Sequence, residues 1–153
     1  MAWKNILVPF NFTNSDEKSL HYVISNFGGE KGVHVTLFHI HTPPPEIDGY
    51  NPALFRVKST MASLATEART REKELQQIVK DLIVSGFLED QIHYVFKTRE
   101  KSVGDEIVAM VLRGGFDTVV LSQQPGKATR AFTRNVHDKV ISNLRNTTIS
   151  IIT

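Results

Sequence analysis

The sequence predicts a single-domain α/β fold, an open parallel five-stranded sheet with helices on both faces. Segments of strand length alternate with longer segments of helical periodicity along the whole chain. The strand segments are apolar on both faces, which is typical of a parallel sheet that is covered on both sides. The chain has 153 residues, the length of one ordinary domain, so we expect one domain over 1–153.

The first strand is predicted at Asn5–Val8, an apolar run that leads into Pro9. Proline cannot donate to a sheet ladder, so Pro9 should mark the carboxyl end of this strand. Ser15 is predicted to cap a helix that ends near Phe27. Because this strand is apolar on both faces, it should lie in the centre of the sheet. The polar turn after it then lies where open α/β sheets bind ligands.

The other elements follow in alternation. The sequence predicts strands at 33–40, 91–97, 117–121 and 147–153, and helices at 53–85, 103–112 and 135–144. The periodicity of 53–85 fits one long amphipathic helix or a kinked pair. The polar third strand should lie near a sheet edge. Residues 122–133 are predicted to form a solvated basic loop, and Pro43–Pro45 an exposed extended loop of unassigned role.

The composition excludes several classes of protein. The chain has no cysteine, which rules out disulfides and cysteine-based zinc sites. The formal charge of +2 is too small to indicate nucleic-acid binding. No apolar run approaches the roughly 18–20 residues of a membrane span, and the N-terminus lacks the pattern of a secretory signal. We therefore expect a cytoplasmic protein with neither a nucleic-acid nor a membrane partner.

The residues do not predict a catalytic or metal site. His39 and His41 lie on one face of a strand, but no third ligand accompanies them, so core and rim positions are favoured over metal binding. Gly126–Thr129 echoes the end of a phosphate-binding loop, yet Leu121 and Ala128 occupy positions that this loop requires as glycine and Ser/Thr. Ser122 lacks the glycines of a nucleophile elbow. We expect a protein that is not an enzyme.

The order of these segments resembles the universal stress protein (UspA-like) family over essentially the whole chain. Lys4–Thr13, KNILVPFNFT, resembles the family's opening K-I-L-V-P-V-D-G-S. Val35–Ile40 resembles its second strand, Asp117–Leu121 its fourth, and Thr148–Ile152 takes the place of its last. The resemblance implies an adenine nucleotide alpha hydrolase-like fold with strand order 3-2-1-4-5, and a dimer. In one branch it implies ATP binding at the carboxyl ends of strands 1 and 4.

The sequence departs from the ATP-binding pattern of that branch. Asn11 replaces the aspartate after the first strand. Ser122 stands at the first glycine of the phosphate loop, and Arg134–Asn135 at its Gly-Ser pair, so that Gly126 alone remains as a loop glycine. Side chains at such positions obstruct the approach of backbone N–H groups to phosphate. The residues that the resemblance places at the cofactor site are Pro9, Asn11, Ile40, Ser122, Gly126, Arg134, Asn135 and Val136.

These departures predict a binding or regulatory module of a stress response that does not bind ATP tightly. The alternative is an adenine-nucleotide-binding switch with a divergent phosphate loop. Lys127, Arg130 and Arg134 keep that alternative open, because they could attract ATP weakly or another anion. No cofactor and no metal is expected. Ile149, Ile151 and Ile152 would leave an apolar sheet edge, so we expect a homodimer through the last strand. The protein partner is not specified by the sequence.

Overall fold

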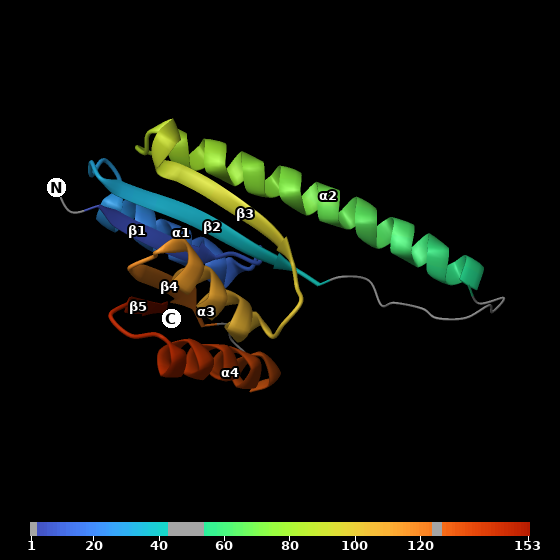
Figure 1. Cartoon of the computed structure of the whole chain (residues 1–153). Helices are drawn as coiled ribbons and strands as arrows, with labels where there is room; N and C mark the ends of the chain where they lie inside the picture. The colour runs from blue at the N-terminus through green and yellow to red at the C-terminus, as the bar shows by residue number, and fades with distance from the viewer. Residues whose placement is uncertain (1–2, 43–53, 124–126) are drawn as a thin grey trace.

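The computed structural model describes residues 3–42, 54–123 and 127–153, and the side chains of these residues except those of 54–64 and 127–134. The described residues form one parallel sheet in the order β3-β2-β1-β4-β5 with four α-helices, and a short 3₁₀ helix, Glu89–Gln91, precedes β3 (Figure 1). This confirms the predicted fold class and strand order. In sequence the elements are β1 Lys4–Pro9, α1 Asn14–Phe27, β2 Val33–His41, α2 Leu54–Val84, β3 Ile92–Thr98, α3 Val103–Gly114, β4 Thr118–Ser122, α4 Lys127–Asn143 and β5 Thr148–Ile152.

The central strand is β1, which pairs in parallel with β2 on one side and β4 on the other. Ile6, Leu7 and Val8 are fully buried because helices cover both faces of the strand. Pro9 is the last residue of β1, as predicted from its missing N–H. The more polar β3 lies at one edge of the sheet, as predicted, and β5 lies at the other.

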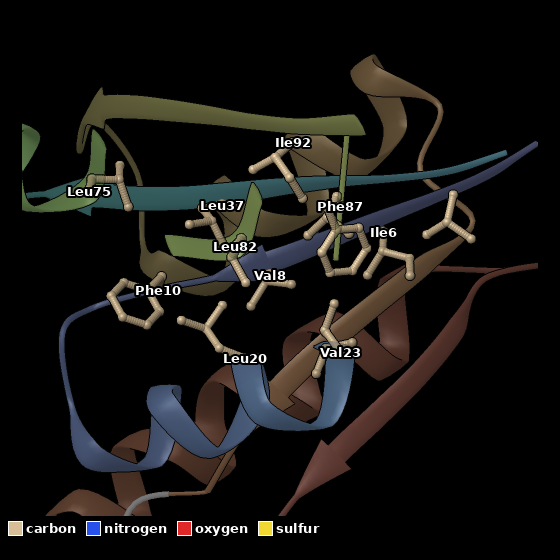
Figure 2. Close-up of a cluster of buried hydrophobic side chains, with 13 residues drawn as sticks. Ile6, Val8, Phe10, Leu20, Val23, Leu37, Leu75, Leu82, Phe87 and Ile92 are labelled. Carbon is tan, nitrogen blue, oxygen red and sulfur yellow. The ribbon is translucent and has the colours of Figure 1, made fainter. Parts of the chain in front are cut away.

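Helices α1 and α2 cover one face of the sheet, and helices α3 and α4 cover the other. Leu20 and Val23 of α1 and Leu75 and Leu82 of α2 pack on Ile6, Val8 and Leu37 (Figure 2). On the opposite face, residues of α3 and α4 pack on β1, β2 and β4; the buried members are Leu7, Phe38, Ile107, Val111, Val119, Leu121, Val140 and Leu144. The layers fix the carboxyl ends of β1, β2 and β4 relative to the surrounding helices.

Three local predictions are corrected or resolved by the structure. Helix α2 is one continuous helix, and it runs past the carboxyl ends of β2 and β3 (Figure 1). The N-cap of α1 is Thr13, not Ser15, because the Thr13 hydroxyl accepts the N–H of Asp16. The predicted basic loop over 122–133 is wrong for 127–133, which form the start of α4. Alanine and arginine are good helix formers, and they outweigh the polarity on which the loop prediction was based.

Two further sequence predictions concern the Pro43–Pro45 segment and membrane spans. Pro43–Pro45 lie outside the described residues. Among the helices that the structure describes, none combines the length and the apolar character that crossing a bilayer requires.

Candidate functional site: a cleft at the carboxyl ends of the strands

A cleft opens at the carboxyl ends of β1, β2 and β4, beneath the first turns of α3 and the middle of α4. Its cavity is about 110 Å³ in volume. The lining residues are Pro9, Phe10, Asn11, Asp16, Phe38, Ile40, Val103, Ile107, Leu121, Ser122, Val136 and His137. Small-molecule pockets typically measure about 300–1,000 Å³. The part of the cleft bounded by described residues is therefore the size of a ring system rather than of a whole nucleotide.

The walls of the cleft differ in chemistry. Six of the lining residues are aliphatic or aromatic side chains of the core that supports α3 and α4: Phe38, Ile40, Val103, Ile107, Leu121 and Val136. The polar side chains at the cleft are those of Asn11, Asp16, Ser122 and His137. This combination of an apolar floor with a few polar groups is typical of a site for a flat, partly polar molecule.

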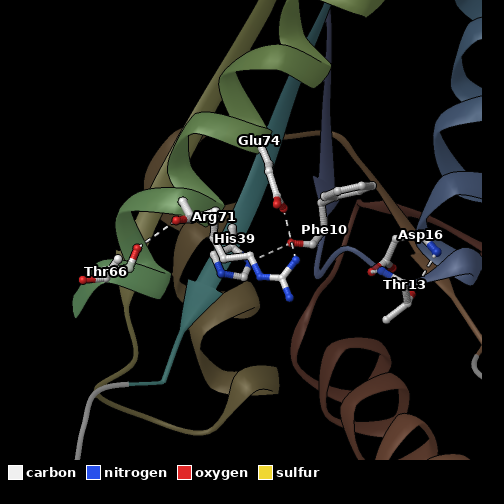
Figure 3. Close-up of polar contacts among 8 residues, drawn as sticks. Phe10, Thr13, Asp16, His39, Thr66, Arg71 and Glu74 are labelled. Atoms are coloured by element: carbon white, nitrogen blue, oxygen red, sulfur yellow. Dashed lines mark hydrogen bonds and ion pairs between the residues drawn. The ribbon is translucent and has the colours of Figure 1, made fainter. Parts of the chain in front are cut away.

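Asp16 is the carboxylate of the cleft, and the start of α1 holds it in place. It is the third residue of the helix, where its carboxylate and the Thr13 hydroxyl cap each other's backbone groups (Figure 3). The side chain is almost fully buried, with 5% of its residue exposed. Its Oδ2 accepts the Asn11 N–H at 2.7 Å, and its Oδ1 accepts the Ser122 hydroxyl at 2.7 Å. The carboxylate thus joins the ends of β1 and β4.

These contacts use donor groups that a bound anion would otherwise need. Backbone N–H groups and hydroxyl groups beside a strand end can donate hydrogen bonds to a bound anion. Here the Asn11 N–H and the Ser122 hydroxyl both point to the Asp16 carboxylate instead. A negative charge near the first turn of a helix is also stabilised by the helix dipole. The Asp16 carboxylate therefore occupies the position between these two donors that a bound anion would take.

A second polar side chain at the cleft, after that of Asp16, is His137 of α4. Its Nε2–H donates to the carbonyl oxygen of Ser122 at 3.3 Å. Burial lowers the pKa of His137 from its ordinary value of 6.5, and the hydrogen bond to Ser122 opposes that shift. The ring is consequently neutral at neutral pH. The His137 ring contacts the carbonyl and not the hydroxyl of Ser122. Asp16, Ser122 and His137 therefore do not form a nucleophile–base relay.

A cluster of rings borders the cleft on the α2 side of the sheet. His39 is buried, and its Nδ1–H donates to the Phe10 carbonyl at 3.0 Å (Figure 3). Burial lowers the pKa of His39, and the Phe10 contact opposes the shift. Phe12 lies 5.1 Å from the rings of both Phe10 and His39, and the Arg71 guanidinium lies over it at 5.0 Å. The buried position of His39 and the half-buried position of His41 confirm the core and rim prediction.

The structure brings five of the eight predicted site residues to the cleft: Pro9, Asn11, Ile40, Ser122 and Val136. Gly126 lies outside the described residues. Arg134 and Asn135 lie within α4 rather than at its beginning; Asn135 is exposed, and it is not among the residues that line the cleft. Arg134 and Asn135 lie within the helix because α4 already begins at Lys127.

Sequence reasoning missed Asp16 and His137. The capping-box pattern was available for Asp16, because Thr13 is followed three residues later by an acidic residue. His137 carried no such signal. The sequence analysis also did not identify Phe12 as a residue beside the cleft, although it occupies the position of the glycine in the resembled opening K-I-L-V-P-V-D-G-S. Its backbone keeps a left-handed conformation, with φ of 60°, which glycine adopts more readily.

Within the described residues, no group of three or more His, Asp or Glu side chains could hold a metal ion. The fold and this cleft define a class, that of single-domain α/β proteins with a cleft where the strand order reverses.

The particular fold is that of universal stress proteins. UspA from Lactobacillus plantarum superposes with a TM-score of 0.73 at 15% identity, over 100% of this chain and 99% of that one. The protein MJ0577, the subject of a structure-based assignment of biochemical function, gives 0.71 at 20% identity over 99% and 96%. A universal stress protein from Archaeoglobus fulgidus, solved in complex with dAMP, gives 0.54 at 14% identity over 99% and 98%. No family model and no curated protein matches the sequence.

Proposed function

We propose that this chain is a universal stress protein-like module that acts in the cytoplasm by binding, not by catalysis, and that its cleft discriminates against ATP. The fold supports the family assignment. The position of the Asp16 carboxylate in the cleft is the observation that carries the discrimination. Among the described lining residues it is the only Asp, Glu, Lys or Arg side chain.

The electrostatic penalty for a polyphosphate in this cleft is large. Two like unit charges 4 Å apart repel by about 4 kcal/mol at the effective dielectric of a protein surface. A triphosphate brings several charges, and two donors that could have compensated it already serve Asp16. If repulsion and missing donors together reduce the binding free energy of ATP by about 3–6 kcal/mol, its affinity falls by a factor of roughly 10²–10⁴.

The cleft instead suits a flat ligand that brings neutral or cationic donor groups. The apolar floor would cover the faces of a ring, and Asp16 and the neutral His137 would serve its polar edge. The dAMP complex of the Archaeoglobus fulgidus protein supports a purine as the ring. We propose a nucleoside or a related uncharged heterocycle as the preferred ligand, with nucleotides bound weakly.

A nucleotide switch is the alternative, and one feature of α4 favours it. The first two turns of this helix contain Lys127, Arg130 and Arg134. A helix N-terminus carries a partial positive charge, and nearby basic residues add to it. An anion held there would sit beside the cleft and could be the phosphate of a nucleotide whose base lies on the apolar floor.

Calorimetric titration with adenosine, AMP and ATP separates the two. Our proposal predicts that affinity falls from adenosine to ATP, and that Val136→Phe, which fills the cavity, weakens every ligand. Saturable ATP binding with a dissociation constant below about 10 μM, tighter than that of adenosine, would establish the switch instead. A phosphate-release assay with ATP is expected to show no turnover.

We also propose that the protein is a homodimer through β5. This strand is an edge of the sheet and its Ile151 is 39% exposed. An exposed apolar edge strand favours pairing with another chain.

A further inference from the structure

A second group of chemically active side chains lies at the opposite end of the sheet from the cleft. His34 is the second residue of β2, and His93 is the second residue of β3. Their rings stack with centroids 5.8 Å apart and planes 10° apart. Trp3, which precedes β1, lies 5.1 Å from the His34 ring. None of these residues takes part in the cleft.

The register of the parallel strands brings the two histidines together. Val35 pairs with Ile92 and Thr36 with His93, so His34 and His93 are diagonal neighbours on adjacent strands. Side chains at even spacing along a strand share a face, so both histidines lie on the same face of the sheet. Diagonal neighbours are within reach of long side chains and rings. His93 is exposed and His34 half-buried, so both rings are open to solvent.

We propose that His34 and His93 form a two-imidazole site for a divalent transition metal ion such as Cu²⁺, Ni²⁺ or Zn²⁺. Imidazole nitrogen is a preferred ligand of these ions, whereas Mg²⁺ and Ca²⁺ require oxygen. With a metal–nitrogen distance of about 2.0–2.1 Å, two imidazoles on one tetrahedral ion have ring centres roughly 5 Å apart. The separation of 5.8 Å lies close to that value. Because the two planes are nearly parallel, metal binding requires a ring to turn so that one nitrogen of each imidazole faces the ion.

The site is an open one. Within the described residues no third His, Asp or Glu joins the pair in a metal-holding group, so the proposed ion would take its other ligands from water. Along β2, Ile40 at the cleft lies six positions after His34, a distance of roughly 20 Å in an extended strand. Metal binding and ligand binding in the cleft are therefore separable by mutation. The pair escaped the sequence analysis because 59 positions separate the two histidines in the chain.

Trp3 makes the proposal directly testable, because it is the only tryptophan in the chain and contacts His34. Tag-free protein is titrated with Ni²⁺ and with Cu²⁺ while tryptophan fluorescence is followed. We expect saturable quenching at one ion per chain, tighter for Cu²⁺ than for Ni²⁺. Excess Zn²⁺ should compete with Ni²⁺ for the site. Saturating Zn²⁺ should also raise the melting temperature, since a ligand of the folded state stabilises it.

Four variants locate the ion. His34→Gln and His93→Gln should each weaken quenching at least tenfold and abolish the Zn²⁺-induced rise in melting temperature. His21→Gln, at an exposed position on α1, and His41→Gln, in the other histidine pair, should bind as the wild type does. Circular dichroism confirms that each variant is folded. The proposal is overturned if the wild type shows no saturable quenching. Quenching that persists in the double variant His34→Gln/His93→Gln also overturns it, because the ion would then bind elsewhere, for example at the terminal amine.

Discussion

Phe12 combines an unfavourable backbone with favourable side-chain contacts. A left-handed conformation costs an ordinary residue about 1–2 kcal/mol, and Phe12 has φ of 60°. The ring offsets this cost through its contacts with Phe10, His39 and Arg71. An aromatic pair contributes about 0.5–1.5 kcal/mol beyond the burial of its area.

Comparing two substitutions separates these effects. Phe12→Ala loses the ring but keeps the backbone cost, so we expect the free energy of unfolding to fall by about 2–3 kcal/mol. Phe12→Gly loses the same ring but removes the strain, so it should be about 1 kcal/mol more stable than the alanine variant. Urea unfolding measures both. An alanine variant at least as stable as the glycine variant would show that the backbone at this position is unstrained.

The buried His39 and the half-buried His137 make stability depend on pH. Burial lowers the pKa values of His39 and His137 in the folded protein below the ordinary value of 6.5. Below that pH the unfolded chain therefore binds more protons than the folded one, and stability falls as the pH drops from about 6.5 toward the folded pKa values. The limiting slope is about 1.4 kcal/mol per pH unit for each histidine.

His39→Asn tests this directly. The asparagine amide can still donate to the Phe10 carbonyl, but it does not titrate, so the dependence of stability on pH between 7 and 5 should become shallower. The exposed His21 provides the matched control, and His21→Gln should keep the wild-type slope. Equal slopes in the wild type and His39→Asn would contradict the assignment.

At this scale the sequence analysis placed the strand-end side chains and one helix side chain, Val136 of α4, at the cleft, and it missed two other helix side chains. The family resemblance placed Pro9, Asn11 and Ser122 at the cofactor site, and all three lie at or next to the ends of neighbouring strands. Asp16 and His137 reach the cleft from α1 and α4. Their positions depend on how the helices pack on the sheet, which local periodicity does not determine.

At the scale of elements, an ion pair between a half-buried lysine and a buried carboxylate joins β3 to α3. The ammonium group of Lys97 contacts Oε2 of Glu106, whose side chain is fully buried. The other oxygen of Glu106, Oε1, has no hydrogen-bond partner among the described residues. Removing one partner of a buried pair typically costs about 3–5 kcal/mol, because the remaining charge is buried without compensation.

We therefore expect Lys97→Met to lower the free energy of unfolding by about 3 kcal/mol. The double variant Lys97→Met/Glu106→Leu should recover most of that loss, since an apolar pair of similar volume needs no compensation. Chemical denaturation of the two single variants and the double variant gives the coupling energy. Additive losses would show that the two charges do not depend on each other.

The elements also show what sequence patterns can determine. Alternation of apolar segments predicted every strand, and the polar character of β3 predicted its edge position. The start of α4 was misplaced because charge in Lys127–Thr133 was taken as evidence of a loop. Charge alone does not distinguish a solvated loop from a solvated helix face. The strand order came from the family resemblance, since the connections permit other parallel orders.

At the scale of the whole molecule, the proposed dimer depends on the β5 edge. Ile151→Lys places a charge on this edge, and charged side chains there oppose pairing. Sedimentation velocity at micromolar concentration should show a dimer for the wild type and a monomer for the variant. Ile141→Lys, at an exposed position on α4, is the matched control and should remain dimeric. A monomeric wild type would contradict the proposal that β5 forms a dimer interface.

The central claim is that the Asp16 carboxylate makes this universal stress protein fold a poor site for ATP. The most direct measurement is the ratio of adenosine to ATP affinity in the wild type and in Asp16→Asn. The variant loses charge-assisted hydrogen bonds, so we expect it to be about 1.5–3 kcal/mol less stable, and the titration is made below its melting transition. Our account predicts that ATP affinity rises at least tenfold, or about 1.4 kcal/mol, while adenosine affinity changes much less. Tight binding of ATP by the wild type, or an unchanged ratio in Asp16→Asn, would contradict it.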